Sequence, residues 1–197
     1  SNFMATFYEV VGGFLVSALV GVILGIAIVW SDRLKRTILP FLVFLNSLPK
    51  IAIAPLFMIW FGYGILPNIL IVFLISFFPV VINTATGLVA VEEDLLDLVR
   101  CLHATKWQKM RKVQLPNSLP YIFSGLKIAA TTAVTGAIVG EFVASDKGLG
   151  SVIIASQTTL ATPVIFGSLI LITIIGMALF GFVGIMERIL MPWERQK

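Results

Sequence analysis

The chain has 197 residues, of which 58% are apolar and only 12% are charged, and its mean hydropathy is +1.03. In soluble domains about a quarter of all residues are charged, so this composition excludes an ordinary soluble enzyme or nucleic-acid-binding domain. The net charge of +4 is distributed among the loops in a way that fits membrane orientation instead. We therefore expect an integral membrane protein in which residues 1–197 form a single domain.

Five segments are long and apolar enough to cross about 30 Å of hydrocarbon, which takes about 20 helical residues. The predicted spans are residues 8–30, 38–61, 66–89, 121–143 and 164–186. The second is the least regular, because Pro40, Pro49 and Pro55 each remove a backbone donor and favour a break or kink. No short apolar stretch with a cleavage site precedes the first span, so we expect no removable signal peptide.

Two glycine pairs lie inside the predicted spans with the small-xxx-small spacing that lets helix backbones approach closely. They are Gly21 with Gly25 and Gly136 with Gly140. Packing within one subunit explains this spacing at least as well as a dimer interface does, so both interpretations stay open.

The basic residues predict the orientation, because loops retained in the cytoplasm collect Lys and Arg. Basic side chains gather in 31–37, in 91–120 and in the tail with Arg188, Arg195 and Lys197, whereas 62–67 has none and 144–163 has only Lys147. We therefore expect the first three segments and the C-terminus to be cytoplasmic. Five crossings then place the N-terminus outside.

Residues 91–120, here called the polar island, hold four of the ten acidic residues, five of the fourteen basic residues and the only histidine and cysteine. Its first half predicts a short amphipathic surface helix, because apolar residues recur at helical spacing. They are Leu95, Leu98, Val99 and Leu102.

The second half of the polar island predicts another helix. Thr105 and Gln108 have the spacing of a capping box, and Pro116 should end the helix. Its apolar side holds Trp107, Met110 and Val113, and its basic side Lys106, Lys109 and Lys112. A solvated charged face is the simpler interpretation of such a loop, but the apolar side chains need a cover. We expect a cytoplasmic partner to supply it.

The polar island resembles the EAA loop of binding-protein-dependent ABC importer permeases. The pattern of that loop is Glu-Ala-Ala, three residues, Gly, nine residues, Ile, one residue and Leu-Pro. Its positions are occupied here, in order, by Asp97, Leu98, Val99, His103, Val113, Leu115 and Pro116. The spacing is preserved throughout, but identity is kept only in the final pair.

The resemblance covers nearly the whole chain. Short segments that look like the nitrate, sulfonate and taurine branch of the family lie at 48–52, 54–56, 60–62, 77–79, 83–84, 119–122, 125–126, 140–141, 148–150 and 192–193. Family members usually begin with one further span before the segment that matches 8–30, which leaves a truncated chain and a short subunit both open.

The resemblance implies an all-α, polytopic bundle of the type I ABC importer permease class in a bacterial-type inner membrane. Its EAA loop would form a coupling helix that docks on cytoplasmic ATPase subunits, which bind ATP and Mg²⁺. An external solute-binding protein and a second permease copy, in a homodimer, are the other implied partners. The implied coupling residues are Asp97, Leu98, Val99, Arg100, His103, Ala104, Thr105, Trp107, Leu115 and Pro116.

The departures from the family pattern fall at three places. His103 replaces a glycine that is used at a turn with positive φ, a region that His tolerates less well than Gly. Asp97 keeps the negative charge on a shorter arm. Leu98 and Val99 enlarge two small positions, so we expect either an altered ATPase groove or weaker coupling.

We expect no catalytic residue, no metal site and no cofactor bound by this chain. The sequence has no G-x-x-x-x-G-K-[ST] loop, so ATP hydrolysis is expected on the partner. His103 has no second histidine beside it, and Cys101 is the only cysteine, which excludes an intrachain disulfide and a multi-cysteine site.

Ionisable residues inside spans are functional candidates, because a charge in hydrocarbon is costly. Lys50 faces a cavity or snorkels to the cytoplasmic interface. Glu141 is expected at the outer surface, where it leads into a flexible turn at 148–150 and serves the outer gate or a binding-protein contact. Polar side chains within the spans either line the pathway or bond to their own helix; they are Asn83, Thr131, Thr132 and Thr135.

The expected substrates are small anions such as sulfonates, taurine or nitrate, with a pyrimidine or vitamin precursor as a further class. The alternative function is a channel or secondary carrier that the polar island regulates. Co-elution of an ATPase would favour the importer, and gradient-driven uptake by the lone chain would favour the alternative. An intramembrane enzyme ranks third, because no paired catalytic groups occur at matching depth.

Overall fold

The computed structural model describes residues 1–192, and Trp193, Arg195 and Lys197 lie outside the described residues. Its elements in chain order are α1 (Asn2–Trp30), α2 (Asp32–Ser47), α3 (Lys50–Phe61), α4 (Ile65–Val89), α5 (Glu93–Cys101), α6 (Lys106–Lys109), the π-helical turn η1 (Met110–Gln114), α7 (Leu115–Ala144), α8 (Leu149–Thr158) and α9 (Thr162–Leu190). No strand occurs between residues 1 and 192. The all-α class predicted from the sequence is confirmed.

Four helices are long and apolar enough to cross a membrane: α1, α4, α9 and the continuous helix of residues 106–143. The pair α2 and α3 makes a fifth crossing only as a broken span, because its two helices meet at 94°. The break falls at Pro49, the N-cap of α3, after Leu48 in extended conformation (ψ 138°). A residue before proline is driven out of the helical region, which explains the position of the break. Pro40 and Pro55 lie inside α2 and α3.

Helix α4 packs against both α1 and α7 and receives the glycine faces of both. A Cβ added to Gly21 or Gly25 of α1 would lie 2.7 or 2.6 Å from an α4 side chain. A Cβ added to Gly136 of α7 would lie 2.8 Å from the Cα of Val72 in α4. Both small-xxx-small pairs therefore pack within one chain, where backbones at close distance hold the bundle together.

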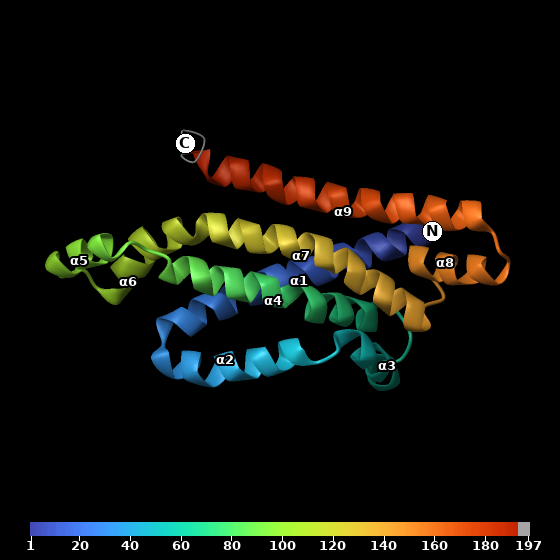
Figure 1. Cartoon of the computed structure of the whole chain (residues 1–197), viewed down its shortest axis with the longest axis horizontal. Coiled ribbons are helices and arrows are strands. Elements are labelled where there is room, and N and C mark those ends of the chain that lie inside the picture. The colour runs from blue at the N-terminus through green and yellow to red at the C-terminus, as the bar shows by residue number, and fades with distance from the viewer. Residues whose placement is uncertain (193–197) are drawn as a thin grey trace.

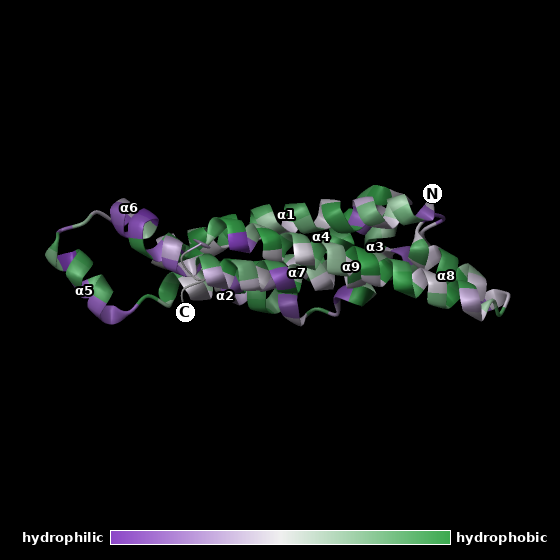
Figure 2. Ribbon diagram, turned by 90° about the horizontal axis from the view of Figure 1, so that it is seen from above, coloured by the Kyte–Doolittle hydropathy of each residue, from purple (hydrophilic) through white to green (hydrophobic). Residues whose placement is uncertain are grey.

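The polar and apolar parts of the molecule are separated along its long axis. Helices α5 and α6 project beyond one end of the bundle, the end that α9 reaches with its C-terminus, while the N-terminus, α3 and α8 lie at the opposite end (Figure 1). Hydrophilic residues concentrate in the projecting part, and the bundle is mostly hydrophobic (Figure 2). The segments 31–37 and 91–120 thus share one end, as the predicted topology requires.

The second helix of the polar island does not end at Pro116, so that prediction was wrong. Helix α6 runs through η1 into α7, and within η1 the amide of Leu115 donates to the carbonyl of Met110, five residues back. Pro116 then lies in the first turn of α7, directly after the π turn. The π turn changes the hydrogen-bond register just before the proline, and the helix continues.

Candidate functional site

The first helix of the polar island, α5, carries an uncovered apolar row. Leu95, Leu98 and Leu102 expose 39%, 56% and 72% of their surfaces, and Val99 beside them is half-buried. These residues share one helix face, as their spacing predicted. Within residues 1–192 this face is left exposed beyond the end of the bundle, and exposed apolar patches of this kind are typical of interaction surfaces.

Charged side chains flank this apolar row. The carboxylate of Asp97 accepts a hydrogen bond from the Arg100 guanidinium over 2.7 Å, and both side chains are mostly exposed. An exposed pair of this kind adds about 0–1 kcal/mol to stability. Both charges therefore remain available for contacts with a partner.

The turn between α5 and α6 keeps the backbone that the family glycine would adopt. His103 has φ 51°, in the left-handed region, and its amide donates to the carbonyl of Arg100 over 2.9 Å. Ala104, which follows, is half-buried, and its backbone amide donates a hydrogen bond to the carbonyl of Val99. The positive φ expected at His103 is confirmed.

The predicted capping box at the start of α6 is also confirmed. The backbone amide of Thr105 donates to the side-chain carbonyl of Gln108 over 2.9 Å, and the Gln108 amide donates to the Thr105 hydroxyl over 3.3 Å. Two amides that the helix leaves without partners are satisfied in this way.

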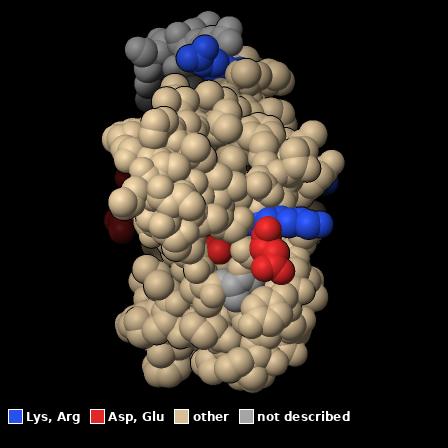
Figure 3. All heavy atoms as spheres, turned by 90° about the vertical axis from the view of Figure 1, so that its right-hand side faces the viewer, with Lys and Arg blue, Asp and Glu red and all other residues tan. Residues whose placement is uncertain are grey.

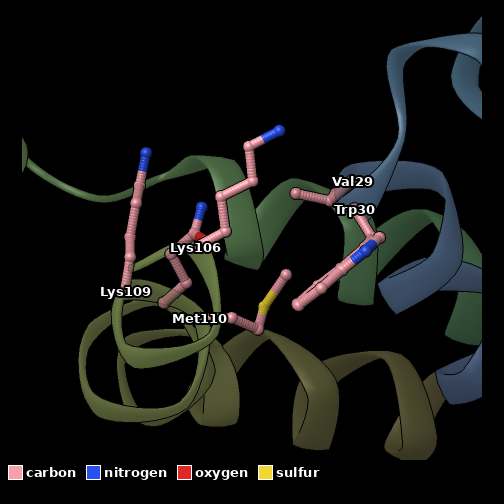
Figure 4. A pocket seen from close by; sticks show the side chains of 6 residues that line it. Val29, Trp30, Lys106, Lys109 and Met110 are labelled. Atoms are coloured by element: carbon pink, nitrogen blue, oxygen red, sulfur yellow. The ribbon is translucent and has the colours of Figure 1, made fainter. Parts of the chain in front are cut away.

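Helix α6 contacts the end of α1 through aromatic rings. The rings of Trp107 and Trp30 meet edge to face with centroids 5.9 Å apart. A cavity of about 250 Å³ lies beside this contact, and in Figure 4 the Met110 thioether points toward the Trp30 ring while the Lys109 ammonium points away from it. The contact fixes α6 against the bundle and leaves Trp107 60% exposed.

Two side-chain amides join the base of the polar island to α4. Gln114 donates to the carbonyl of Leu88, and Asn117 donates to the carbonyl of Ala90. The helix end leaves these carbonyls without intrahelical partners. Sequence reasoning missed both residues, although amides that flank the predicted end of a span are a signal for such caps. The coupling candidates Leu115 and Pro116 lie between them, half-buried and exposed respectively.

The predicted pathway residues are not brought into one site. Lys50 donates to the side chain of Asn46 over 2.7 Å and lies 5.6 Å from the centroid of the Phe78 ring. Asn83 donates to the carbonyl of Pro79 in its own helix. No hydrogen bond in the described part of the chain joins Lys50 or Asn83 to the threonines of α7.

The three threonines of α7 differ in their environment. The hydroxyls of Thr131 and Thr132 both donate to the carbonyl of Ile128, over 2.8 and 3.1 Å. Thr131 and Thr135 lie one turn apart on an exposed face of α7, and Thr132 is half-buried. The face with Thr131 and Thr135 is therefore an exposed polar strip on α7.

Glu141 is buried, which differs from the expected position at the outer surface. Only 2% of it is exposed, and its carboxylate accepts hydrogen bonds from the Thr6 hydroxyl in α1 and from the Gly150 amide, each over 2.5 Å. The segment 148–150 is not a flexible turn. A Cβ on Gly148 would lie 2.2 Å from the Glu141 side chain, and Leu149 begins α8.

Two further polar contacts inside the bundle were missed by sequence reasoning. Glu9 in α1 is 1% exposed and accepts a hydrogen bond from Asn68 of α4 over 2.8 Å. Lys127 of α7 forms an ion pair with Glu187 of α9. The rule that selected Lys50 and Glu141 applies equally to Glu9 and Lys127, because both lie inside predicted spans.

Comparison with protein families adds the observation that decides the class. The family model described as "Binding-protein-dependent transport system inner membrane component" matches residues 17–196. The chain belongs to this family. The predicted recognition as an ABC transporter permease is thereby confirmed.

Three curated relatives are similar over most of the chain. The formylaminopyrimidine transport permease protein ThiX of Halalkalibacterium halodurans is 33% identical over 185 residues, which cover 94% of this chain and 74% of the relative. The riboflavin transport system permease protein RibX of Chloroflexus aurantiacus is 36% identical, with 82% and 60% covered. The taurine transport system permease protein TauC of Escherichia coli is 30% identical over 90% of this chain.

The aligned part of the chain covers 74% of the length of ThiX and 60% of the length of RibX.

Among solved structures, a chain of the inward-facing MetNI methionine ABC transporter matches with a TM-score of 0.79 and 20% identity, covering 95% of this chain and 93% of that one. This likeness confirms the predicted polytopic importer-permease fold.

Proposed function

We propose that this chain is the permease subunit of an ATP-driven ABC importer that moves a small solute from an external binding protein into the cytoplasm. In this proposal the polar island and the C-terminus are cytoplasmic, residues 1–197 form one transmembrane domain, and a second copy completes the pathway as a homodimer. The ATPase partner binds ATP and Mg²⁺.

The observation that carries the proposal is the uncovered apolar row on α5, outside the bundle. A surface of this kind is stabilised when a hydrophobic groove covers it, as in helix-in-groove recognition. The ATPase subunit supplies that groove. Because α6 continues into α7 without a loop, a movement of the docked ATPase reaches the transmembrane helix directly.

The pathway is proposed to follow the α7 face with Thr131 and Thr135. Both residues lie on an exposed side of α7, within the segment that is long and apolar enough to cross a membrane, where polar side chains are candidates for a pathway. Thr132, Asn83 and Lys50 belong to the lining in other conformations of the importer, and Glu141 acts at its outer end.

The substrate is proposed to be a small polar solute of the classes that the relatives' names describe. The formylaminopyrimidine, riboflavin and aliphatic sulfonate classes are favoured over taurine, because the permeases named for them are 33%, 36% and 34% identical, against 30% for TauC. Uptake into proteoliposomes with the cognate binding protein tests this order. Competition by taurine but not by a formylaminopyrimidine would reverse it.

A matched pair of double variants tests the docking surface. The first replaces Leu98 and Leu102 with Gln and thus changes the apolar face of α5. The second replaces Glu93 with Gln and Cys101 with Ser, at two exposed positions that lie off the apolar face and outside the implied coupling residues. We expect the first to lose most of the ATPase subunit during co-purification and the second to retain it. Equal retention by both variants would contradict the proposed surface.

A further inference from the structure

Two carboxyl groups lie together at the end of the bundle opposite the polar island. Glu9 and Glu141 are 1% and 2% exposed. Thr6, one turn before Glu9 on α1, donates to Glu141. Asn68 donates to Glu9, and its Oδ1 lies 2.7 Å from a Cβ added to Gly140, the residue before Glu141. Among residues 1–192, the ion pairs use other acids, Asp97 and Glu187. Within the described residues, neither buried carboxyl therefore forms an ion pair.

The hydrogen bonds distinguish the two groups. Glu141 accepts at both oxygens, from the Thr6 hydroxyl at Oε1 and from the Gly150 amide at Oε2. Glu9 accepts only at Oε1, from the Asn68 amide, and its buried Oε2 has no partner. Glu141 therefore accepts hydrogen bonds at both carboxylate oxygens, whereas one carboxylate oxygen of Glu9 has no hydrogen-bond partner.

Two like charges in one buried site cannot both persist, because each loses its hydration and repels the other. A buried oxygen without a hydrogen-bond partner is a second cost. One proton on Glu9 Oε2 removes both problems, since it neutralises one acid and supplies a donor to the other. We propose that Glu9 and Glu141 form a one-proton site, in which neutral Glu9 donates from Oε2 to ionised Glu141.

The remaining negative charge is matched by the N-terminus of α8. Besides the Gly150 amide on Glu141, the Leu149 amide donates to the Thr6 hydroxyl over 2.8 Å, and that hydroxyl in turn donates to Glu141. The amides and dipole of a helix N-terminus stabilise an anion. The pair and its partners therefore fasten α8 to α1, α4 and α7.

A proton fits the donor set better than a metal ion does. The oxygens near this pair that have no partner are Glu9 Oε2 and Asn68 Oδ1, whereas Ca²⁺ takes six to eight oxygen ligands. No group of three or more acidic, histidine or cysteine side chains within the described residues is placed to hold a metal ion.

The site has a route to water at the same end of the molecule. A cavity of about 410 Å³ is lined by Glu9 together with exposed Tyr63, Asp146 and Lys147. Figure 3 views this end, where acidic and basic side chains lie next to each other on a mostly uncharged face. The proton can therefore exchange with solvent on that side. Asp146 and Lys147 are the charged side chains that face the cavity.

Two isosteric substitutions test which acid holds the proton, and the result does not depend on transport activity. Gln at position 9 accepts from Asn68 and donates to Glu141, so Glu9→Gln should unfold within about 2 °C of the unchanged protein. Glu141→Gln removes the charge at the α8 N-terminus and should lower the unfolding midpoint by roughly 5 °C. Equal losses, or a larger loss for Glu9→Gln, would overturn the assignment.

Infrared spectroscopy gives a readout that a structural role alone would not produce. The difference spectrum between the unchanged protein and Glu9→Gln should contain the C=O stretch of one protonated carboxylic acid, and the band should shift in ²H₂O. This measurement needs only the Glu9→Gln variant, so it remains decisive if Glu141→Gln fails to fold. A difference spectrum with only carboxylate bands would overturn the one-proton site.

Discussion

The side-chain amide of Gln114 in η1 donates a hydrogen bond over 3.0 Å to the backbone carbonyl of Leu88, near the end of α4. The contact joins two residues that flank the polar island, and the bond from Asn117 to Ala90 lies next to it. The polar island is therefore tied at its base to both α4 and α7. A force applied to α5 and α6 is shared by two transmembrane helices.

Replacement of Gln114 by Met keeps the side-chain length and removes the donor. Loss of one such bond costs about 1 kcal/mol, so we expect a folded protein that still binds its ATPase but shows several-fold lower stimulation of ATP hydrolysis. The measurement is solute-stimulated hydrolysis in proteoliposomes. Gln157→Met, at an exposed position of α8, is the control, and normal stimulation by Gln114→Met would exclude the proposed tie.

Reversal of the charge at Asp97 should lower transport and ATPase stimulation without affecting membrane insertion. The exposed pair with Arg100 contributes little to folding, so Asp97→Lys acts on the partner surface. Glu92→Lys makes the same change at the exposed N-cap of α5, five residues before Asp97 and on the other side of the helix, and should have a weaker effect. The assigned coupling role of Asp97 fails if stimulation in reconstituted vesicles stays unchanged.

Close packing of α7 on α4 predicts opposite effects for two glycine substitutions. A Cβ on Gly136 would meet the Cα of Val72 at 2.8 Å, whereas a Cβ on Gly181 in α9 has no neighbour within 4 Å. We expect Gly136→Ala to destabilise the protein by about 1–3 kcal/mol through overpacking. Gly181→Ala should be neutral or stabilising, because alanine favours a helix. Thermal unfolding in detergent measures both, and similar midpoints would argue against the close contact.

The ion pair between Lys127 and Glu187 predicts a non-additive pair of substitutions. Both side chains are largely buried, at 28% and 23% exposure. Lys127→Met should cost about 2 kcal/mol, because it leaves the Glu187 charge without its partner. Adding Glu187→Leu should restore part of that loss. A double variant less stable than either single one would show that the pair does not join α7 to α9.

Local features of the sequence predicted local features of the structure. The capping box of Thr105 and Gln108, the positive φ at His103 and the apolar face of α5 all depend on residues a few positions apart. Long apolar runs likewise located α1, α4, α7 and α9, because length and hydropathy are properties of a single segment.

The contacts that escaped prediction are those that depend on which helix faces meet. Thr6 and Glu141 are separated by 135 residues, and Glu9 and Asn68 by 59. One sequence does not reveal that these side chains share a site, since many pairings of the spans satisfy the same hydropathy. The continuation of the helix through Pro116 was missed for another reason, because it depends on a change of backbone register in η1.

That register also fixes the direction in which α6 faces. A π turn contains one residue more than an α-helical turn, and one residue corresponds to about 100° of rotation about the helix axis. The edge-to-face contact of Trp107 with Trp30 therefore exists at the angle that η1 sets. A return of these five residues to α-helical register would swing Trp107 through roughly a quarter turn while the helix from α6 to α7 stayed unbroken.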